Sequence, residues 1–200
     1  MKYIIIGMHC SGKQEIADIL ENNGIKCGKL FTNIENTSNI YNGLNYEQYS
    51  TKDINEIFEN NAYIFLQEYT FDNDISFVNT KYYEGLSLYS FENNEVFVLS
   101  PDQLFAINPA SIKEEVTFIW LDNIKKDRLN KYYAEKRSYS FSARESIELK
   151  DSTSFVKFLY GFNNSHVLYF TNEDPARVAA IIYSVVKHPD LLPMFIETFN

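Results

Sequence analysis

The first fourteen residues place the strongest limit on the fold of this chain. An apolar run, Tyr3 to Ile6, is followed by Gly7, four further residues, and then Gly12 and Lys13. Such a continuous apolar run, rich in β-branched residues, is typical of a strand covered on both faces of a parallel sheet. A helical pattern begins at Lys13, so the glycines lie between a buried strand and a helix N-terminus. In that position, backbone N–H groups, the helix dipole and a lysine can all be directed at one anion.

Residues 7–14 match the pattern G-x-x-x-x-G-K-[ST] except at the last position, where Gln14 stands. In this pattern the loop cradles phosphates, the lysine reaches the β- and γ-phosphates, and the Ser/Thr hydroxyl binds Mg²⁺. We therefore predict a phosphate-binding loop, with Gln14 as a weak metal ligand. His9 and Cys10 have two interpretations: a phosphate contact and an activated thiol, or tolerated variable positions, which we favour. The predicted loop residues are Gly7, His9, Cys10, Ser11, Gly12, Lys13 and Gln14.

Composition and charge exclude several classes of protein. The net charge is −9, and only four of the 18 cations are arginines, so binding to nucleic acid through bulk charge is disfavoured. Cys10 and Cys27 form no CxxC pair and the three histidines are scattered, which predicts neither a zinc site nor a disulfide framework. No apolar run approaches the roughly 20 residues of a membrane span. We expect a cytoplasmic protein with no membrane or nucleic-acid partner.

Helical and strand patterns alternate along the chain, with a β-rich stretch in the middle. This alternation predicts an α/β fold with a parallel core and an inserted lobe. Ser100 followed by Pro101 is a strong helix start, and the apolar tail after Pro189 is expected to pack on the body. The predicted helices are 13–21, 50–60, 123–135, 143–159 and 175–187, and the predicted strands are 25–32, 62–69, 75–83, 96–99, 116–121 and 166–171.

A series of short motifs follows the loop in a fixed order. The motifs are Phe31-Thr32-Asn33-Ile34, Tyr46-Glu47-Gln48-Tyr49-Ser50 with an acidic helix after it, Lys81-Tyr82-Tyr83-Glu84-Gly85, Val96 to Asp102, Arg128-Leu129 leading to Arg144, and Thr171-Asn172-Glu173-Asp174. As a set, and over roughly residues 2–187, the series resembles the guanylate kinases, a branch of the nucleoside monophosphate kinases. Each motif alone is weak.

The resemblance implies a three-layer P-loop NTPase fold and ATP-dependent, Mg²⁺-assisted phosphorylation of a nucleoside or deoxynucleoside monophosphate. It implies one domain over 1–200, with its core in 1–32, 95–125 and 145–200, a monophosphate-binding lobe at about 33–94 and a helical lid at about 126–144. Lys13, Arg128, Arg137 and Arg144 would stabilise the transferred phosphoryl group, as this chemistry requires. Asp102 would lie near Mg²⁺ and the acceptor, and Asn172 beside the donor base. The implied acceptor contacts are Thr32, Tyr46, Glu68, Tyr82, Tyr83, Ser100 and Asp102.

Two departures from the family pattern bear on activity. No arginine precedes Arg128, and Ile34 stands near where an acceptor-binding arginine is expected. Lys29, Lys52 or Lys81 could take its place, but a lysine does not reproduce the bidentate fork of arginine. Together with Gln14, this leaves two hypotheses open. One is a weakened monophosphate kinase that acts on small-molecule nucleotides; the other is a catalytically degenerate module that binds a nucleotide or a protein partner.

Overall fold

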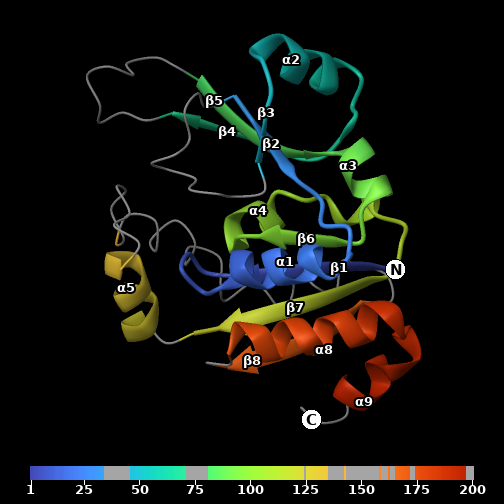
Figure 1. The fold of residues 1–200 in the computed structure, drawn as a ribbon. Coiled ribbons are helices and arrows are strands. Elements are labelled where there is room, and N and C mark those ends of the chain that lie inside the picture. Colours follow the sequence, from blue (N-terminus) through green and yellow to red (C-terminus); the bar gives the residue numbers. More distant parts are fainter. Residues whose placement is uncertain are drawn as a thin grey trace.

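The computed structural model describes residues 1–33, 46–70, 81–123, 125–134, 142, 158, 162, 165–171 and 174–196. Its central element is a four-stranded sheet of order β6-β1-β7-β8, in which all neighbours are parallel (Figure 1). The strands are β1 (Lys2–Gly7), β6 (Val96–Leu99), β7 (Val116–Asp122) and β8 (His166–Thr171). The predicted α/β class with a parallel core is confirmed.

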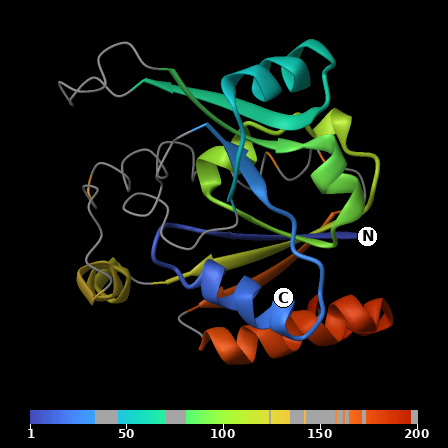
Figure 2. The same cartoon turned by 45° about the horizontal axis from the view of Figure 1, so that its top comes forward.

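Strand β1 is buried along its whole length, as its apolar run predicts. Tyr3 and Ile5 belong to a core on one face of the sheet, where α1 (Lys13–Asn22) and α8 (Pro175–Lys187) pack (Figure 2). The tail continues through a 3₁₀ turn (Pro189–Leu191) into α9 (Leu192–Ile196), and Leu192 joins the same core. The expectation that the tail packs on the body is therefore confirmed.

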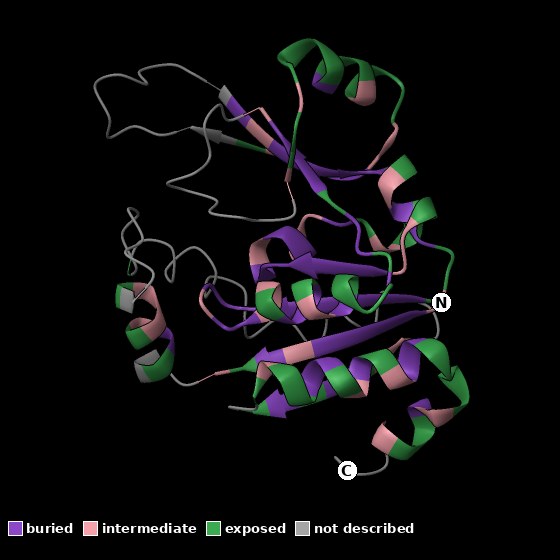
Figure 3. Ribbon diagram, in the orientation of Figure 1, coloured by how far each residue is buried: buried purple, intermediate pink, exposed green. Residues whose placement is uncertain are grey.

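The opposite face of the central sheet is covered by α3 (Leu88–Asn93), α4 (Pro101–Phe105) and a second sheet of order β3-β2-β5-β4. This sheet consists of β2 (Leu30–Thr32), β3 (Tyr46–Gln48), β4 (Tyr63–Thr70) and β5 (Lys81–Ser87), and β4 and β5 are antiparallel. Phe65 and Leu86 share a core with Ile4 and Ile6 of β1. Figure 3 shows buried residues concentrated in the sheets and an exposed outer surface on α2 (Thr51–Glu59).

The strand expected at 25–32 is shorter than predicted. Only Leu30–Thr32 forms β2, whereas Cys27 makes a single bridge to Val96 at the edge of the central sheet. Between them the chain passes the ring of Phe97, and a Cβ on Gly28 would lie 2.1 Å from Phe97 Cε1. The apolar run therefore leaves one sheet at Cys27 and enters the other at Leu30, which a local pattern does not reveal.

Helix boundaries agree more closely with the sequence. α2 begins after Ser50, whose side chain accepts the backbone N–H of Asp53 while the Asp53 carboxylate accepts the backbone N–H of Ser50. α5 (Lys125–Ala134) lies within the range 123–135. Apart from Phe158, the helix predicted at 143–159 lies outside the described residues, as do residues 75–80 of the strand predicted at 75–83. The division into core, monophosphate lobe and lid stays a prediction.

Among the described helices, none by itself has the length and apolar character needed to cross a membrane. One pair, Pro175–Lys187 with Pro189–Ile196, has them only when taken together, and the two helices are bent by 115° at the break.

Candidate functional site

The carboxyl ends of β1, β6 and β7 meet at one edge of the central sheet, because the three strands are parallel neighbours. β1 leads into the loop of residues 8–12, β6 leads into α4, and β7 leads toward α5. In open α/β sheets, ligands bind in the crevice at this edge, where the connections diverge. The structure therefore brings the predicted loop, Asp102 and the start of α5 to the same edge.

The loop after β1 has an unusual backbone. Cys10 has φ 59° and Gly12 has φ 89°, both in the left-handed region, while His9 and Ser11 do not. This alternation turns successive N–H groups toward the same side and forms a concave anion-binding nest. Gly7 allows the loop to fold back closely, since a Cβ there would lie 2.4 Å from Ser11 Oγ. This backbone geometry favours the binding of an anion.

Two polar groups of the loop support this interpretation. Ser11 is 4% exposed, and its Oγ has no hydrogen-bond partner among the residues that the structure describes. Lys13 Nζ donates to the carbonyl oxygen of Met8 at 3.0 Å, which holds the ammonium group across the loop. A buried hydroxyl with no partner among the described residues, beside a nest and a lysine, fits a bound phosphate group.

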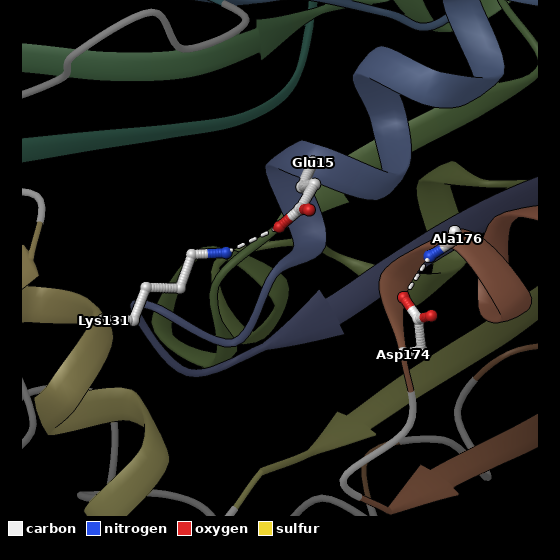
Figure 4. Close-up of polar contacts among 4 residues, drawn as sticks. All are labelled: Glu15, Lys131, Asp174 and Ala176. Atoms are coloured by element: carbon white, nitrogen blue, oxygen red, sulfur yellow. Dashed lines mark hydrogen bonds and ion pairs between the residues drawn. The ribbon is translucent and has the colours of Figure 1, made fainter.

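One residue of α5 and one of α8 lie close to Gly12 of the loop. A Cβ on Gly12 would lie 3.2 Å from Pro175 Cγ and 3.9 Å from Lys131 Nζ. Lys131 forms an ion pair with Glu15 of α1, with 2.8 Å between Nζ and Oε2 (Figure 4). The same view shows Asp174 accepting the backbone N–H of Ala176 at the start of α8. Lys131 therefore adds a second cation beside the loop.

The sequence prediction missed Lys131, although a pattern was available. Lys131 follows Arg128 by three residues in the predicted helix, so the two cations are neighbours on its surface. Arg128 itself is 6% exposed, and its Nε donates to the carbonyl oxygen of Asn123 at 3.2 Å, just beyond β7. Arg137, Arg144 and Asn172 lie outside the described residues.

The structure offers little for a metal at the loop. Gln14 Nε2 donates to Asp18 Oδ1 at 2.8 Å on the exposed surface of α1, so the amide lies along the helix. Within the described part of the chain, no group of three or more His, Cys, Asp or Glu side chains could hold a metal ion. Gln14 and Asp102 stay proposed metal contacts, since Mg²⁺ in phosphate sites is bound through only one or two protein carboxylates.

Several predicted acceptor residues lie on the face of the second sheet that meets α4. Glu84 of β5 pairs directly with Thr32 of β2 and Gln67 of β4, and directly paired residues lie on the same face. Tyr82 lies two residues from Glu84 and shares that face. Gln67 Nε2 donates to the backbone carbonyl of Asp102 at 3.1 Å, which joins this face to the end of β6.

The alternation of side chains puts Glu68 and Tyr83 on the opposite face. These two residues pair with each other across β4 and β5, and Glu68 is exposed. Gln67, one residue before Glu68, lies on the face toward α4. The roles predicted for Glu68 and Tyr83 stay predictions, and the two side chains lie on the face opposite to that of Glu84 because neighbouring residues of a strand alternate between faces.

A buried polar network ties α4 to the second sheet. Gln103 of α4 is 3% exposed and its Nε2 donates to Tyr46 Oη at 2.9 Å and to the carboxylate of Glu84, which is fully buried. Gln103 Oε1 accepts the backbone N–H of Ser100 at 2.8 Å. Ser100 and Tyr46, predicted from the sequence, are thereby connected through Gln103, which also bonds to Glu84, and neither Gln103 nor Glu84 was predicted. The spacing from Ser100 to Gln103 is that of a capping box, which could have identified Gln103.

Charge is unevenly distributed along the chain. Residues 33–94, the predicted monophosphate lobe, contain ten Asp and Glu but only two lysines, Lys52 and Lys81. This segment therefore carries −8 of the total charge of −9. A phosphate dianion that approached this segment would be repelled by its net negative charge.

No family model matches the sequence, and no curated protein does. Among the 61 matching chains of solved structures is guanylate kinase from Anaplasma phagocytophilum. The two chains are 13% identical, the match covers 94% of this chain and 85% of that chain, and the TM-score is 0.51. At this identity the likeness concerns the fold, and the chain shares its α/β architecture with a guanylate kinase.

Proposed function

We propose that this protein binds ATP at the loop of residues 7–13 and transfers the γ-phosphoryl group to a nucleoside or deoxynucleoside monophosphate. The observation that carries the proposal is the loop itself. Left-handed Cys10 and Gly12, the buried hydroxyl of Ser11 and the ammonium group of Lys13 converge where a buried parallel strand meets a helix N-terminus. The likeness in fold to a guanylate kinase supports the class of acceptor.

The donor half of the site supplies positive charge. Phosphoryl transfer depends on positioning and on stabilising charge over the transferred group rather than on covalent catalysis. The loop N–H groups and Lys13 hold the β- and γ-phosphates in this proposal, and Lys131 joins them from α5. Arg128, Arg137 and Arg144 are the proposed lid cations. Mg²⁺ bound with the nucleotide would supply charge neutralisation, and Asp102 is the carboxylate that we propose would contact it.

The acceptor half uses neutral groups. The monophosphate is proposed to bind between α4 and the second sheet, with Thr32, Tyr46 and Tyr82 on one side and Ser100 and Asp102 on the other. Each hydroxyl contact contributes about 0.5–1.5 kcal/mol, whereas a contact to a charged partner contributes roughly 1.5–3 kcal/mol. Without arginines in this half, we expect weak acceptor binding and slow transfer.

A transfer assay with labelled ATP and GMP, dGMP, dTMP or AMP tests the proposal. The expected result is a labelled nucleoside diphosphate from at least one acceptor, and its loss in the Lys13→Ala variant. Wild-type protein that binds ATP and transfers nothing to any of the four would contradict the kinase. Gln14 and the negative charge of residues 33–94 favour the alternative, a degenerate nucleotide-binding or protein-interaction module. Binding of ATP without transfer to any of the four acceptors would support this alternative.

A further inference from the structure

Gln103 lies at the junction between α4 and the second sheet, and its contacts fix the orientation of its amide. A backbone N–H can only donate, so the atom that faces Ser100 N must be the carbonyl oxygen Oε1. The amide NH₂ group therefore faces Glu84 and Tyr46. This assignment follows from the partners rather than from the shape of the side chain.

The orientation of Gln103 determines the polarity of the Tyr46 hydroxyl. Because Tyr46 Oη accepts from Gln103 Nε2 at 2.9 Å, its own O–H acts as the donor toward other groups. A phosphate dianion has no proton to give and requires donors. Tyr46 is half-buried on the sheet face that meets α4, where the acceptor is proposed to bind.

We propose that Gln103 is a positioning residue that makes Tyr46 a hydrogen-bond donor for the acceptor phosphate and couples it to Glu84. This inference rests on the proposed function, since it needs an acceptor phosphate at Tyr46. Glu84 serves as the buried anchor: its carboxylate accepts from Gln103 and orients the amide. Gln103 itself does not touch the substrate.

Exchanging the two side chains separates this role from a purely structural one. In Gln103→Glu, the new carboxylate still accepts from Ser100 but faces Glu84, and Tyr46 must donate to it. In the double variant Glu84→Gln/Gln103→Glu, the amide at position 84 donates to the carboxylate at position 103 and the buried pair is restored. Tyr46 still donates to that carboxylate in the double variant, so the polarity of its hydroxyl stays reversed. Glu84→Gln alone keeps the Gln103 amide and is the matched control.

The measurements are the thermal unfolding temperature and the KM values for the monophosphate and for ATP. We expect the unfolding temperature to fall in Gln103→Glu and to recover in the double variant. The acceptor KM should stay raised about ten- to hundredfold in the double variant, the range for losing a hydrogen bond to a charged group. It should rise much less in Glu84→Gln, where the amide oxygen at position 84 still accepts from Gln103, and the KM for ATP should change little throughout. Tyr46→Phe should raise the acceptor KM by a similar factor.

These measurements distinguish a failure of the positioning role of Gln103 from a failure of the proposed function. If the wild-type protein transfers phosphate and the double variant regains both its stability and its acceptor KM, Gln103 acts only structurally and the positioning role is wrong. If the wild-type protein transfers phosphate to no monophosphate, the proposed function fails, and this role fails with it. A rise in acceptor KM in Glu84→Gln equal to that in the double variant would also overturn the role of Tyr46 polarity.

Discussion

Gln14 occupies the position at which a hydroxyl group would bind the metal of a nucleotide, and it instead bonds to Asp18 along the surface of α1. Replacing Gln14 by Ser loses one exposed hydrogen bond, which has little effect on stability, and places a hydroxyl at the end of the loop. We predict that Gln14→Ser raises nucleotide affinity or turnover in saturating Mg²⁺, measured by calorimetry and by the transfer assay. Gln14→Ala is the control, and equal behaviour of the two variants would show that the hydroxyl group does not act as a metal ligand.

At the residue scale, the two halves of the site differ in how far the sequence predicts them. The loop is contiguous, so Gly7, Gly12 and Lys13 could be identified from spacing and from the strand before them. The acceptor half is assembled from β2, β3, β4, β5 and α4, and its register depends on long-range pairing. Gln67 and Glu84 face α4 because of that register, and a local sequence pattern does not contain it.

The contact between α1 and α5 is made by Glu15 and Lys131, beside Gly12. This carboxylate lies in the first turn of α1, and in the proposed function it would compete with the triphosphate for Lys131. We predict that Glu15→Gln strengthens triphosphate binding about two- to fivefold, a modest effect because the pair is partly exposed. Lys131→Met should weaken binding by a similar factor.

Glu21→Gln is the matched control for this element, since it removes the same charge from the last turn of α1. Calorimetric titration with MgATP compares the two variants. An equal change in affinity for Glu15→Gln and Glu21→Gln would show that net charge, and not the pairing with Lys131, is responsible.

The helices and strands that were predicted well from the sequence are those whose ends depend on contacts between residues close together in the chain. α2 starts at Ser50 because its capping partners, Ser50 and Asp53, are three residues apart, and such a motif is visible in the sequence. β2 was predicted too long because the apolar run from Ile25 serves two sheets in turn. The change of sheet at Gly28 depends on Phe97, which lies far along the chain, and no local pattern contains it.

At the scale of the whole molecule, two buried groups, Tyr3 and Cys27, contribute to a decrease in the free energy of unfolding at high pH. Burial, with nearby carboxylates, raises the pKa of the Cys27 thiol from 9.0 to about 12 and that of Tyr3 from 10.0 to about 12. The folded state therefore keeps these protons while the unfolded state releases them, so the free energy of unfolding falls as the pH rises from 9 toward 12. Chemical denaturation across this range should show the decline, and Cys27→Ala should make it shallower. An identical slope in Cys27→Ala would contradict the assignment to this thiol.

The charge of −8 on residues 33–94 predicts how acceptor binding responds to salt. Salt screens repulsion between the acidic segment and a phosphate dianion, so GMP affinity should hold or rise between about 0.02 and 0.2 M salt. We expect GMP to bind more weakly than about 100 μM, because neutral hydroxyls replace arginines. ATP held by Lys13 and Lys131 should bind more weakly as salt increases. Calorimetry of GMP with a non-hydrolysable ATP analogue present tests this, and parallel weakening of both ligands would contradict the proposed acceptor site.

The central claim is that a triphosphate binds in the loop of residues 7–13, and Lys13 tests it most directly. Lys13 is only half-buried and its Nζ lies across the loop, outside the apolar cores, so Lys13→Ala should leave the fold intact. The measurement is a calorimetric titration of wild-type and Lys13→Ala protein with MgATP, with thermal unfolding as the check on folding. We predict that affinity falls at least about tenfold, the loss of one charge-assisted contact to phosphate. Unchanged affinity in a folded Lys13→Ala protein would show that ATP does not bind in this loop.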